Sequence, residues 1–280
     1  MAREGLPVEV CCRLLGVSCA GFYAWRGRPP SARAIRHAWL TDLIREVHLA
    51  SYGSYGAHRV HAELVLGRGI HVGHNAVSLL MQRAGIQGRT GTRRRYTMPG
   101  AATSEDLVDR VFARSRPNQL WVTDITEHPT REGKVYCAVV LDAFSRRVVG
   151  WSISHSPDAT LATNALGMAI QQRDARRGET IIHSDHGTAF TAWTFTQRAR
   201  NSGLLPSMGS VGDCYDNGLI EAFWSRMQVE LLDTRRWKTR VELATAIFEY
   251  IEIFHNRRRR HSSLDMRTPI EYELLHTTAA

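Results

Sequence analysis

The chain has 280 residues, which suggests one large domain plus a smaller one, or two to three small ones. Its hydrophobic share of 43% and charged share of 22% are usual for a folded protein. It has no apolar run of about 18 residues, and its first residues lack the apolar core of a signal peptide. Five cysteines without CxxC spacing argue against a disulfide framework and a zinc–thiolate site. We therefore expect a cytoplasmic protein that is not membrane-bound.

The net charge of +9 is unevenly distributed along the chain. Residues 1–118 contain 17 arginines and 8 acidic residues, whereas residues 119–280 contain 19 basic and 19 acidic residues. Such asymmetry is typical of a nucleic-acid-binding module beside a neutral one, although a solvated basic surface without a partner is the alternative.

Two short helices are predicted within residues 8–26, where apolar residues follow helical spacing as far as Leu15. Gly16 interrupts this pattern, and Ser18 is a suitable cap for the second helix. We interpret residues 1–36 as a short segment resembling a helix-turn-helix.

Residues 37–87 are predicted to form a helical DNA-binding domain with a second such unit, in which a turn at GRGI separates the helices GAHRVHAELVL and HNAVSLLMQRAG. The alternative is a helical hairpin that only packs. The HxxH…HxxH pattern suggests a zinc site, but no cysteine lies near it, so we expect surface histidines at His58, His61, His71 and His74.

Residues 88–118 are rich in Gly, Arg, Thr, Ser and Pro, which predicts a basic, partly extended linker. Arg93, Arg94 and Arg95 could follow a DNA backbone, because neutralising phosphates releases counterions.

From residue 119 onward the pattern changes to strands and helices. The segments 119–127, 134–142 and 146–154 are rich in β-branched and aromatic residues, which predicts an antiparallel meander. We expect further strands at 179–184 and 204–207 and helices near 159–176, 190–202, 216–232 and 240–256. The order βββαβαβαα is that of an α/β domain of the ribonuclease H-like fold, with a mixed sheet and flanking helices over residues 119–280.

Three acidic residues lie where a metal site is expected. Asp124 is a charge inside the apolar strand WVTDIT, which is costly without compensation. Asp185 ends the strand IIHSD, and functional groups gather beyond the carboxyl ends of strands. Glu221 lies at the edge of the apolar face of a predicted helix. Taken singly, these residues could be an ion-pair partner, a helix cap and a solvated acid.

Together, the three carboxylates match the oxygen ligands that magnesium prefers. Two such ions about 3.5–4 Å apart can hold the attacking and leaving oxygens of a phosphodiester displacement. The sequence therefore predicts Asp124, Asp185 and Glu221 as catalytic metal ligands, with two Mg²⁺ ions for which Mn²⁺ can substitute.

WVTDIT, LDAFSRRVVGW, HSDHGTAF and YDNGLIEAFW resemble, in this order, the motifs of the DDE transposases of bacterial insertion sequences. The resemblance is to the product of the second of two overlapping frames, in the retroviral integrase superfamily. It covers nearly the whole chain, and 35 residues separate Asp185 from Glu221, as in that group. The chain departs from the group at Gln228, where a basic residue that contacts the transposon end is usual.

This resemblance implies DNA cleavage at the element's ends, followed by attack of the freed 3′-hydroxyl on target DNA. It also implies terminal inverted repeats and target DNA as partners, a homo-oligomer, fusion or partnership with the upstream frame's product, and location at the nucleoid. A catalytically silent DNA-binding regulator or transposase remnant is the alternative, and a ribonuclease H-like nuclease without strand joining is a third possibility.

Other residues have open interpretations. His183, Asp216 and Asn217 are candidates for supporting the carboxylates, although His183 could simply pack and Asp216 could cap a helix. We expect Asp142 to have a structural role in its turn. The run Arg257, Arg258, Arg259 and Arg260 either ends a helix in solvent or, as we favour, contacts DNA.

Overall fold

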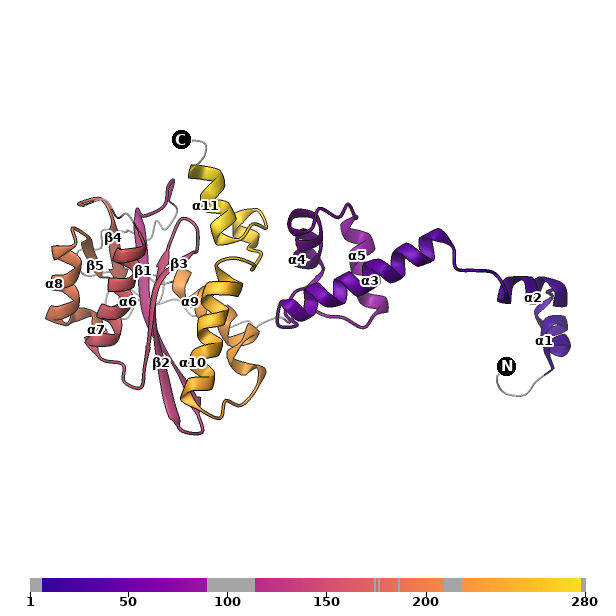
Figure 1. Cartoon of the computed structure of the whole chain (residues 1–280), viewed down its shortest axis with the longest axis horizontal. Coiled ribbons are helices and arrows are strands. Elements are labelled where there is room, and N and C mark those ends of the chain that lie inside the picture. Colours follow the sequence, from indigo (N-terminus) through magenta and orange to yellow (C-terminus); the bar gives the residue numbers. More distant parts are fainter. Residues whose placement is uncertain are drawn as a thin grey trace, which may run out of the picture.

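The computed structural model describes residues 7–89, 114–173, 175, 177–185, 187–208 and 218–277. Figure 1 shows a sheet between two layers of helices, with the N-terminal helices extending away from one of these layers. The termini lie far apart, because the first two helices project from the end of a long third helix. The chain thus has a layered α/β part and an elongated helical part.

The N-terminal part contains five α-helices in the described residues: α1 (Val8–Leu15), α2 (Cys19–Arg26), α3 (Ala32–Ala50), α4 (Ala57–Ala62) and α5 (His74–Arg83). Gly16 ends α1 in the left-handed conformation, with a φ of 66°. The Ser18 hydroxyl caps α2 by accepting from the amide of Gly21 at 3.0 Å. Both predicted helix pairs are therefore confirmed. The sequence pattern did not predict the long helix α3.

The α/β part has a five-stranded sheet in the order β3-β2-β1-β4-β5. Strands β1 to β3 are antiparallel neighbours, whereas β4 runs parallel to β1 and β5 runs parallel to β4. The predicted meander and mixed sheet are thus confirmed, and the order of elements is that of the ribonuclease H-like fold. The strands are β1 (Leu120–Thr130), β2 (Gly133–Asp142), β3 (Val148–Ser154), β4 (Ile181–Ser184) and β5 (Leu205–Met208).

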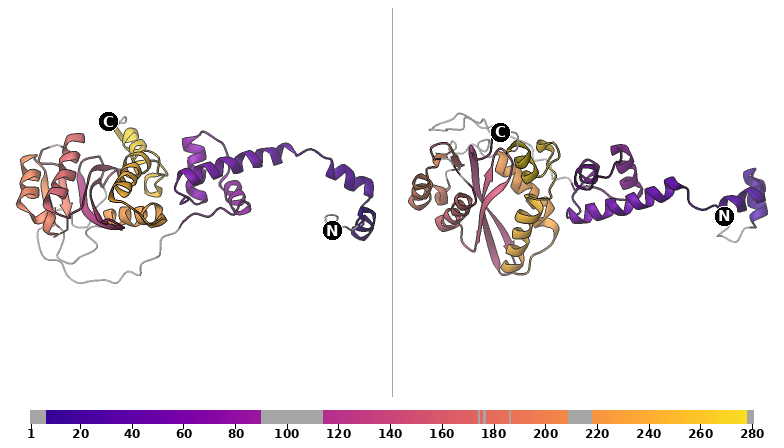
Figure 2. Two further views of the ribbon diagram at one scale, coloured as in Figure 1. Left: turned by 60° about the horizontal axis from the view of Figure 1, so that its bottom comes forward. Right: turned by 45° about the horizontal axis from the view of Figure 1, so that its top comes forward.

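Alternate residues of β1 face opposite layers of helices, as the two-residue period of a strand requires. Trp121 packs with residues of α6 and α8 on one face. Leu120 and Val122 pack with residues of α9 and α10 on the other. Figure 2 shows the sheet seen between these layers. The helices of this part are α6 (Ala159–Gln172), α7 (Thr188–Thr191), α8 (Trp193–Asn201), α9 (Gly218–Glu230), α10 (Arg240–Phe248) and α11 (Pro269–Thr277).

The helical unit α3–α5 shares a continuous hydrophobic core with the layer that contains α9 and α10. The ring of Tyr52 meets that of Phe254 edge-on, with 4.9 Å between centroids. The Tyr55 hydroxyl accepts a hydrogen bond from the amide of Arg260 at 2.6 Å. The contact between the helical unit and the α/β part therefore contains both apolar packing and hydrogen bonds, in addition to the chain connection.

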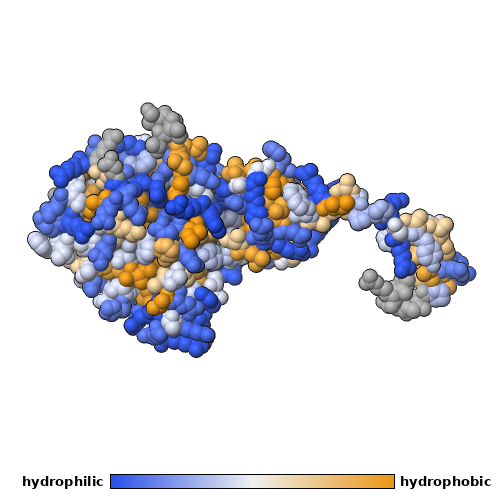
Figure 3. Space-filling view, in the orientation of Figure 1, coloured by the Kyte–Doolittle hydropathy of each residue, from blue (hydrophilic) through white to orange (hydrophobic). Residues whose placement is uncertain are grey.

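Helices α1 and α2 keep large apolar side chains exposed, among them Leu14 and Trp25, and Figure 3 shows apolar residues on the surface of this unit. Within the described residues, no single helix has the length and hydropathy to cross a membrane. The pair of α1 and α2, bent by 107° relative to each other, reaches that length and composition when taken together.

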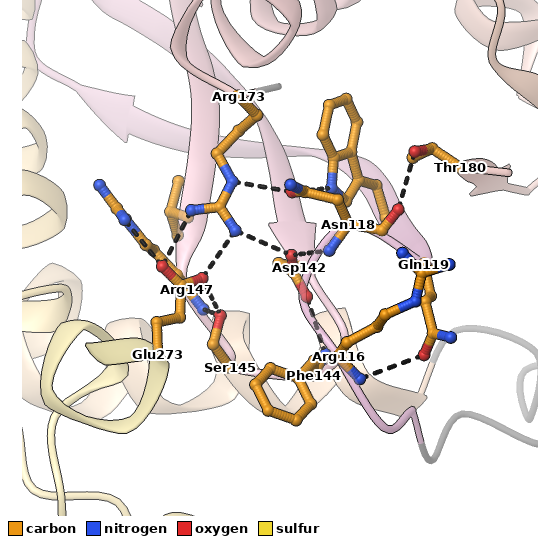
Figure 4. Close-up of polar contacts among 12 residues, drawn as sticks. Arg116, Asn118, Gln119, Asp142, Phe144, Ser145, Arg147, Arg173, Thr180 and Glu273 are labelled. Carbon is orange, nitrogen blue, oxygen red and sulfur yellow. Dashed lines mark hydrogen bonds and ion pairs between the residues drawn. The ribbon is translucent and has the colours of Figure 1, made fainter. Parts of the chain in front are cut away.

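A polar network attaches α11 to the sheet, and the sequence did not predict this helix. Asp142 is fully buried and accepts hydrogen bonds from the amides of Asn118 and Phe144 at 2.8 and 2.9 Å. Arg173 bridges Asp142 to Glu273 of α11, with contacts of 3.2 and 2.8 Å (Figure 4). The structural role expected for Asp142 is therefore confirmed.

Glu273 also pairs with Arg147 at 2.8 Å, so it holds two arginines beside the sheet. Replacing it with glutamine leaves part of this positive charge buried and unpaired. We expect Glu273→Gln to lower the free energy of unfolding by roughly 3 kcal/mol in urea denaturation. The matched control is Glu249→Gln, because Glu249 is an exposed acid. An equal effect of both substitutions would contradict the role assigned to the network.

Candidate active site

The parallel pairing of β1 with β4 brings two of the predicted acids to the same level of the sheet. Val122 is in register with His183, so continuing by two residues places Asp124 level with Asp185. Strand β4 ends at Ser184, and Asp185 is the first residue beyond it. The two carboxylates thus lie at the carboxyl end of β4, the edge at which α/β sheets gather functional groups.

Asp124 points toward α9, because it shares a face of β1 with Leu120 and Val122. The indole Nε1 of Trp224 donates a 3.0 Å hydrogen bond to its Oδ2, and the amide of Ile125 donates to its Oδ1 at 2.7 Å. The sequence pattern places Trp224 in the apolar stripe of the helix. Its position three residues after Glu221, on a neighbouring part of the same face, was the signal that the ring could reach a strand carboxylate.

Burial is the largest of the causes that raise the pKa of Asp124 to about 6; the charges of Asp185 and Glu221 act in the same direction, whereas the two hydrogen bonds lower it. The three acids therefore act on one another electrostatically. Asp185 is exposed, and its Oδ1 accepts a 2.9 Å hydrogen bond from the amide of Gly187. Glu221 is exposed on the first turn of α9. Asp124 is thus partly desolvated, whereas Asp185 and Glu221 are exposed to solvent.

These oxygen donors match a hard divalent cation in type, and a cation would relieve the unfavourable ionisation of Asp124. As the side chains stand in the described residues, no group of three His, Cys, Asp or Glu side chains is arranged to hold a metal ion. The chemistry of the donor set therefore fits magnesium, whereas the side chains are not closed around one.

Of the residues predicted to support the carboxylates, His183 is the one that the structure describes. His183 is buried in β4, and its Nδ1 lies 3.1 Å from the Ser207 hydroxyl on β5. This contact directs the ring toward β5, and its support of the carboxylates stays a prediction. Asp216, Asn217, Arg93, Arg94 and Arg95 lie outside the residues that the structure describes.

The arginine run does not act as one surface. Arg257 and Arg258 are exposed, but Arg259 and Arg260 are each 3% exposed. Arg259 is paired with Glu230 at 2.7 Å, and Arg260 with Glu63 of the helical unit at 2.7 Å. Arg259 and Arg260 are therefore buried and held in ion pairs within the chain, so the four arginines do not form one exposed surface, and their contact with DNA stays a prediction.

Two further polar residues of α9 are paired within the chain. The Gln228 side-chain amide donates to Asp233 at 2.5 Å. The residue that departs from the family pattern thus contacts the segment that follows α9. Glu230 is buried in its pair with Arg259 and accepts from the Tyr250 hydroxyl at 2.8 Å. Glu230 is thus a structural acid and not a candidate for the catalytic set.

Three of the four histidines singled out in the helical unit do come together. The rings of His58 and His74 stack with centroids 4.2 Å apart, and His61 meets His74 edge-on at 5.8 Å. His58 is exposed, and His61 and His74 are partly exposed, as expected for surface histidines. Within the described residues, these histidines do not form a group that could hold a metal ion.

Domain families match most of this architecture. Residues 114–214 match the family described as integrase core domain, residues 202–269 match a second family with that description, and residues 35–96 match an HTH-like domain. The sheet, its helical layers and the acidic edge thus define an integrase core preceded by a helix-turn-helix-like unit.

Curated relatives match nearly the whole chain. The transposase for insertion sequence element IS904 of Lactococcus lactis is 33% identical over 88% of this chain and 98% of its own length. The transposase for IS629 of Shigella sonnei is 36% identical over 91% and 88%, and transposase InsF for IS3A of Escherichia coli is 32% identical over 95% and 93%. The chain belongs to this family of insertion-sequence transposases, which confirms the resemblance seen in the sequence.

Among solved structures, the catalytic core domain of HTLV-2 integrase in complex with magnesium is 19% identical with a TM-score of 0.42, covering 57% of this chain and 99% of that one. The catalytic core domain of BIV integrase is 21% identical with a TM-score of 0.41, covering 58% and 99%.

The buried charge of Asp124 leads to a prediction about stability. Its folded pKa of about 6 lies above the unfolded value, so the folded chain holds this proton more tightly. Stability from the proton is present at low pH and is lost as the pH rises through about 6. We expect Asp124→Asn to raise the free energy of unfolding by about 2 to 3 kcal/mol above pH ~7 in the presence of chelator. Near pH ~4 the substitution should change the free energy of unfolding little.

Thermal and urea unfolding at both pH values, without divalent metal, measure this difference. Asp233→Asn is the control, because Asp233 is an exposed carboxylate. A loss of stability in Asp124→Asn at the higher pH would show that its carboxylate is compensated in the metal-free chain.

Proposed function

We propose that this transposase cleaves DNA at the ends of an insertion sequence and joins the freed 3′-hydroxyl to target DNA, with Asp124, Asp185 and Glu221 as its catalytic residues. The observation that supports this proposal is the parallel register of β1 and β4, which places Asp124 level with Asp185, together with the effect of the Asp185 and Glu221 charges on the pKa of Asp124. The three acids come from a strand, a strand end and a helix, and we propose that they converge when a metal ion binds.

The residues have distinct roles in this proposal. Asp124 is the anchored ligand, since Trp224 and the amide of Ile125 hold both of its oxygens. Asp185 is held by the amide of Gly187, and Glu221 has a longer side chain that can swing toward the other two. The exposed faces of these two acids leave the site open to a DNA strand.

Magnesium, held by the three carboxylates as one ion or two, would neutralise charge on the phosphodiester and promote ionisation of the attacking water. Manganese satisfies the same oxygen donors and is expected to substitute. Excess chelator is therefore expected to abolish cleavage.

The HTH-like domain is the proposed site of binding to the terminal inverted repeats, with Arg257 and Arg258 as exposed candidates for further DNA contact. We further propose that the chain acts at the nucleoid as a homo-oligomer, in fusion or partnership with the upstream frame's product. A catalytically silent regulator would bind the same DNA but would not cleave it.

The decisive test compares two acids on either side of the start of α9. Glu221→Gln is expected to lower cleavage and strand transfer by at least about 10³-fold. It removes a carboxylate that would hold the metal ion, and that ion would stabilise the negative charge developing on the phosphodiester. Asparagine serves as a helix cap as well as aspartate does, so Asp216→Asn should retain measurable activity if residue 216 only caps α9. Both reactions are measured on DNA carrying an element end, with circular dichroism and DNA binding as controls for folding.

Activity that survives in Glu221→Gln but is lost in Asp216→Asn would overturn the assignment. Strand cleavage without joining, in the parent chain, would instead indicate a plain nuclease.

The contact between Trp224 and Asp124 gives a second test. A donor lowers the pKa of the carboxylate that accepts from it, so Trp224→Phe should raise the pKa of Asp124. The acid limb of the pH–rate profile should then move to higher pH by about one unit, which corresponds to a charge-assisted hydrogen bond. Trp193→Phe is the matched control, because Trp193 is 73% exposed on α8. An unmoved acid limb with a lowered maximal rate would indicate that the indole only packs.

A further inference from the structure

Next to the carboxylates, α9 presents a neighbouring face to a cavity of about 310 Å³. Since a water occupies about 30 Å³ of liquid, this volume holds a group much larger than one solvent molecule. We refer to it as the arginine pocket. Its polar lining consists mainly of Arg59, Arg146, Arg226, Arg259, Ser262 and Ser263.

The arginine pocket has a surplus of positive charge. Four arginines line it, and none of its lining residues is acidic. Glu230, behind the wall, is bidentate to Arg259 at 2.7 and 2.8 Å and reaches Arg59 only at 3.8 Å. One carboxylate therefore serves two arginines, and for Arg146 and Arg226 no ion pair is recorded within the described residues.

The two imidazoles of the wall do not add to this charge. Burial and the charge of Arg259 lower the pKa of His255 to about 4 and that of His261 well below its usual value. The Nε2 of His255 lies 2.8 Å from the carbonyl of Arg146, which fixes this ring against the loop that carries the arginine. The positive charge of the pocket thus comes from arginines alone.

Arg146 is the residue whose placement most needs a ligand. Its backbone is left-handed, with a φ of 60°, and its amide donates to the carbonyl of Asp142 in the turn between β2 and β3. Its Nη1 is buried and has no hydrogen-bond acceptor among the described residues. Buried guanidinium donors are normally satisfied, so this Nη1 is available to a hydrogen-bond acceptor that enters the pocket.

The pocket is adjacent to the proposed catalytic centre. Ala222, which lines it, directly follows Glu221, and Arg226 lies one turn further along α9. Glu221 and the pocket therefore occupy neighbouring faces of the same turn. A DNA strand that reaches the carboxylates can place a nearby phosphate over Arg226.

We propose that the arginine pocket binds a backbone phosphate of the DNA on which the carboxylates act. The proposal rests on the proposed function. Guanidinium groups offer paired donors that match the oxygens of a phosphate, and the hydroxyls of Ser262 and Ser263 add further donors. Such a contact positions the strand and carries no base specificity.

The pocket also joins the two parts of the chain. Arg59 belongs to α4 of the helical unit, whereas Arg226 belongs to α9 of the integrase core. A phosphate between them is therefore held from both sides, and binding DNA strengthens the contact between the two parts.

The first arm of the test uses inorganic phosphate as the probe on the full chain, without divalent metal. Phosphate should raise the melting temperature of the parent and of Arg200→Gln, a control for an exposed arginine on α8. It should raise that of the double variant Arg146→Gln, Arg226→Gln much less. Neither side chain has a recorded hydrogen-bond partner in the described residues, so the variant should fold, which circular dichroism checks.

The second arm measures affinity for duplex DNA across a salt series, again without metal so that cleavage does not interfere. Arg226→Gln is expected to weaken binding by about tenfold on all sequences and to reduce the slope of log affinity against log salt by about one. Arg200→Gln should change neither quantity.

Phosphate stabilisation of the parent with unchanged DNA affinity in Arg226→Gln would assign the pocket to free phosphate and overturn the proposal. The proposal would also be overturned if the variants kept both the stabilisation by phosphate and the DNA affinity of the parent. Glu221→Gln should bind phosphate and DNA as the parent does. If Glu221→Gln still cleaves DNA, the catalytic assignment fails while the result for the pocket stands.

Discussion

The buried pair of Glu230 and Arg259 is the contact on which the rest of the arrangement depends. Both side chains are nearly inaccessible to solvent, and the pair is bidentate. Removing either partner would leave a buried charge without compensation, which costs about 3–5 kcal/mol. Because Glu230 ends α9 and also reaches Arg59 of the helical unit, this pair sets where α9 lies. The position of α9 in turn decides how Glu221 approaches the strand ends.

The strands and their order were predictable from local features. Runs of β-branched and aromatic residues with clear turns predicted the meander, and the charge of Asp124 within such a run was itself the sign of a site. The arginines at the end of the chain were not predictable in this way. Arg259 and Arg260 resemble solvated residues in the sequence, and their partners Glu230 and Glu63 are remote from them along the chain. Charge patterning identifies a cationic run, but only tertiary packing decides which of its members face solvent.

The role of Trp224 was missed for a related reason. Helical periodicity assigned it to the buried stripe, and the ring is indeed partly buried. Periodicity does not show what a ring nitrogen faces, and a small rotation of α9 would have directed the indole toward an apolar neighbour. An indole has an apolar body and one polar donor, so it can pack beneath a carboxylate and bind it as well. The third helix and α11 escaped prediction because tertiary contacts, including those of Glu273, stabilise elements whose own sequence pattern is weak.

The continuous core between the helix-turn-helix-like unit and the integrase core has an evolutionary consequence. Tyr52 and Tyr55 pack on the ring of Phe254, and Glu63 neutralises Arg260. A recombinant that exchanged the helical unit for that of another insertion sequence would confront these side chains with foreign ones. Substitutions on the two sides of the contact must therefore accumulate together. New recognition specificities should arise by changes on the outer faces of α3 to α5, and rarely by shuffling the unit as a whole.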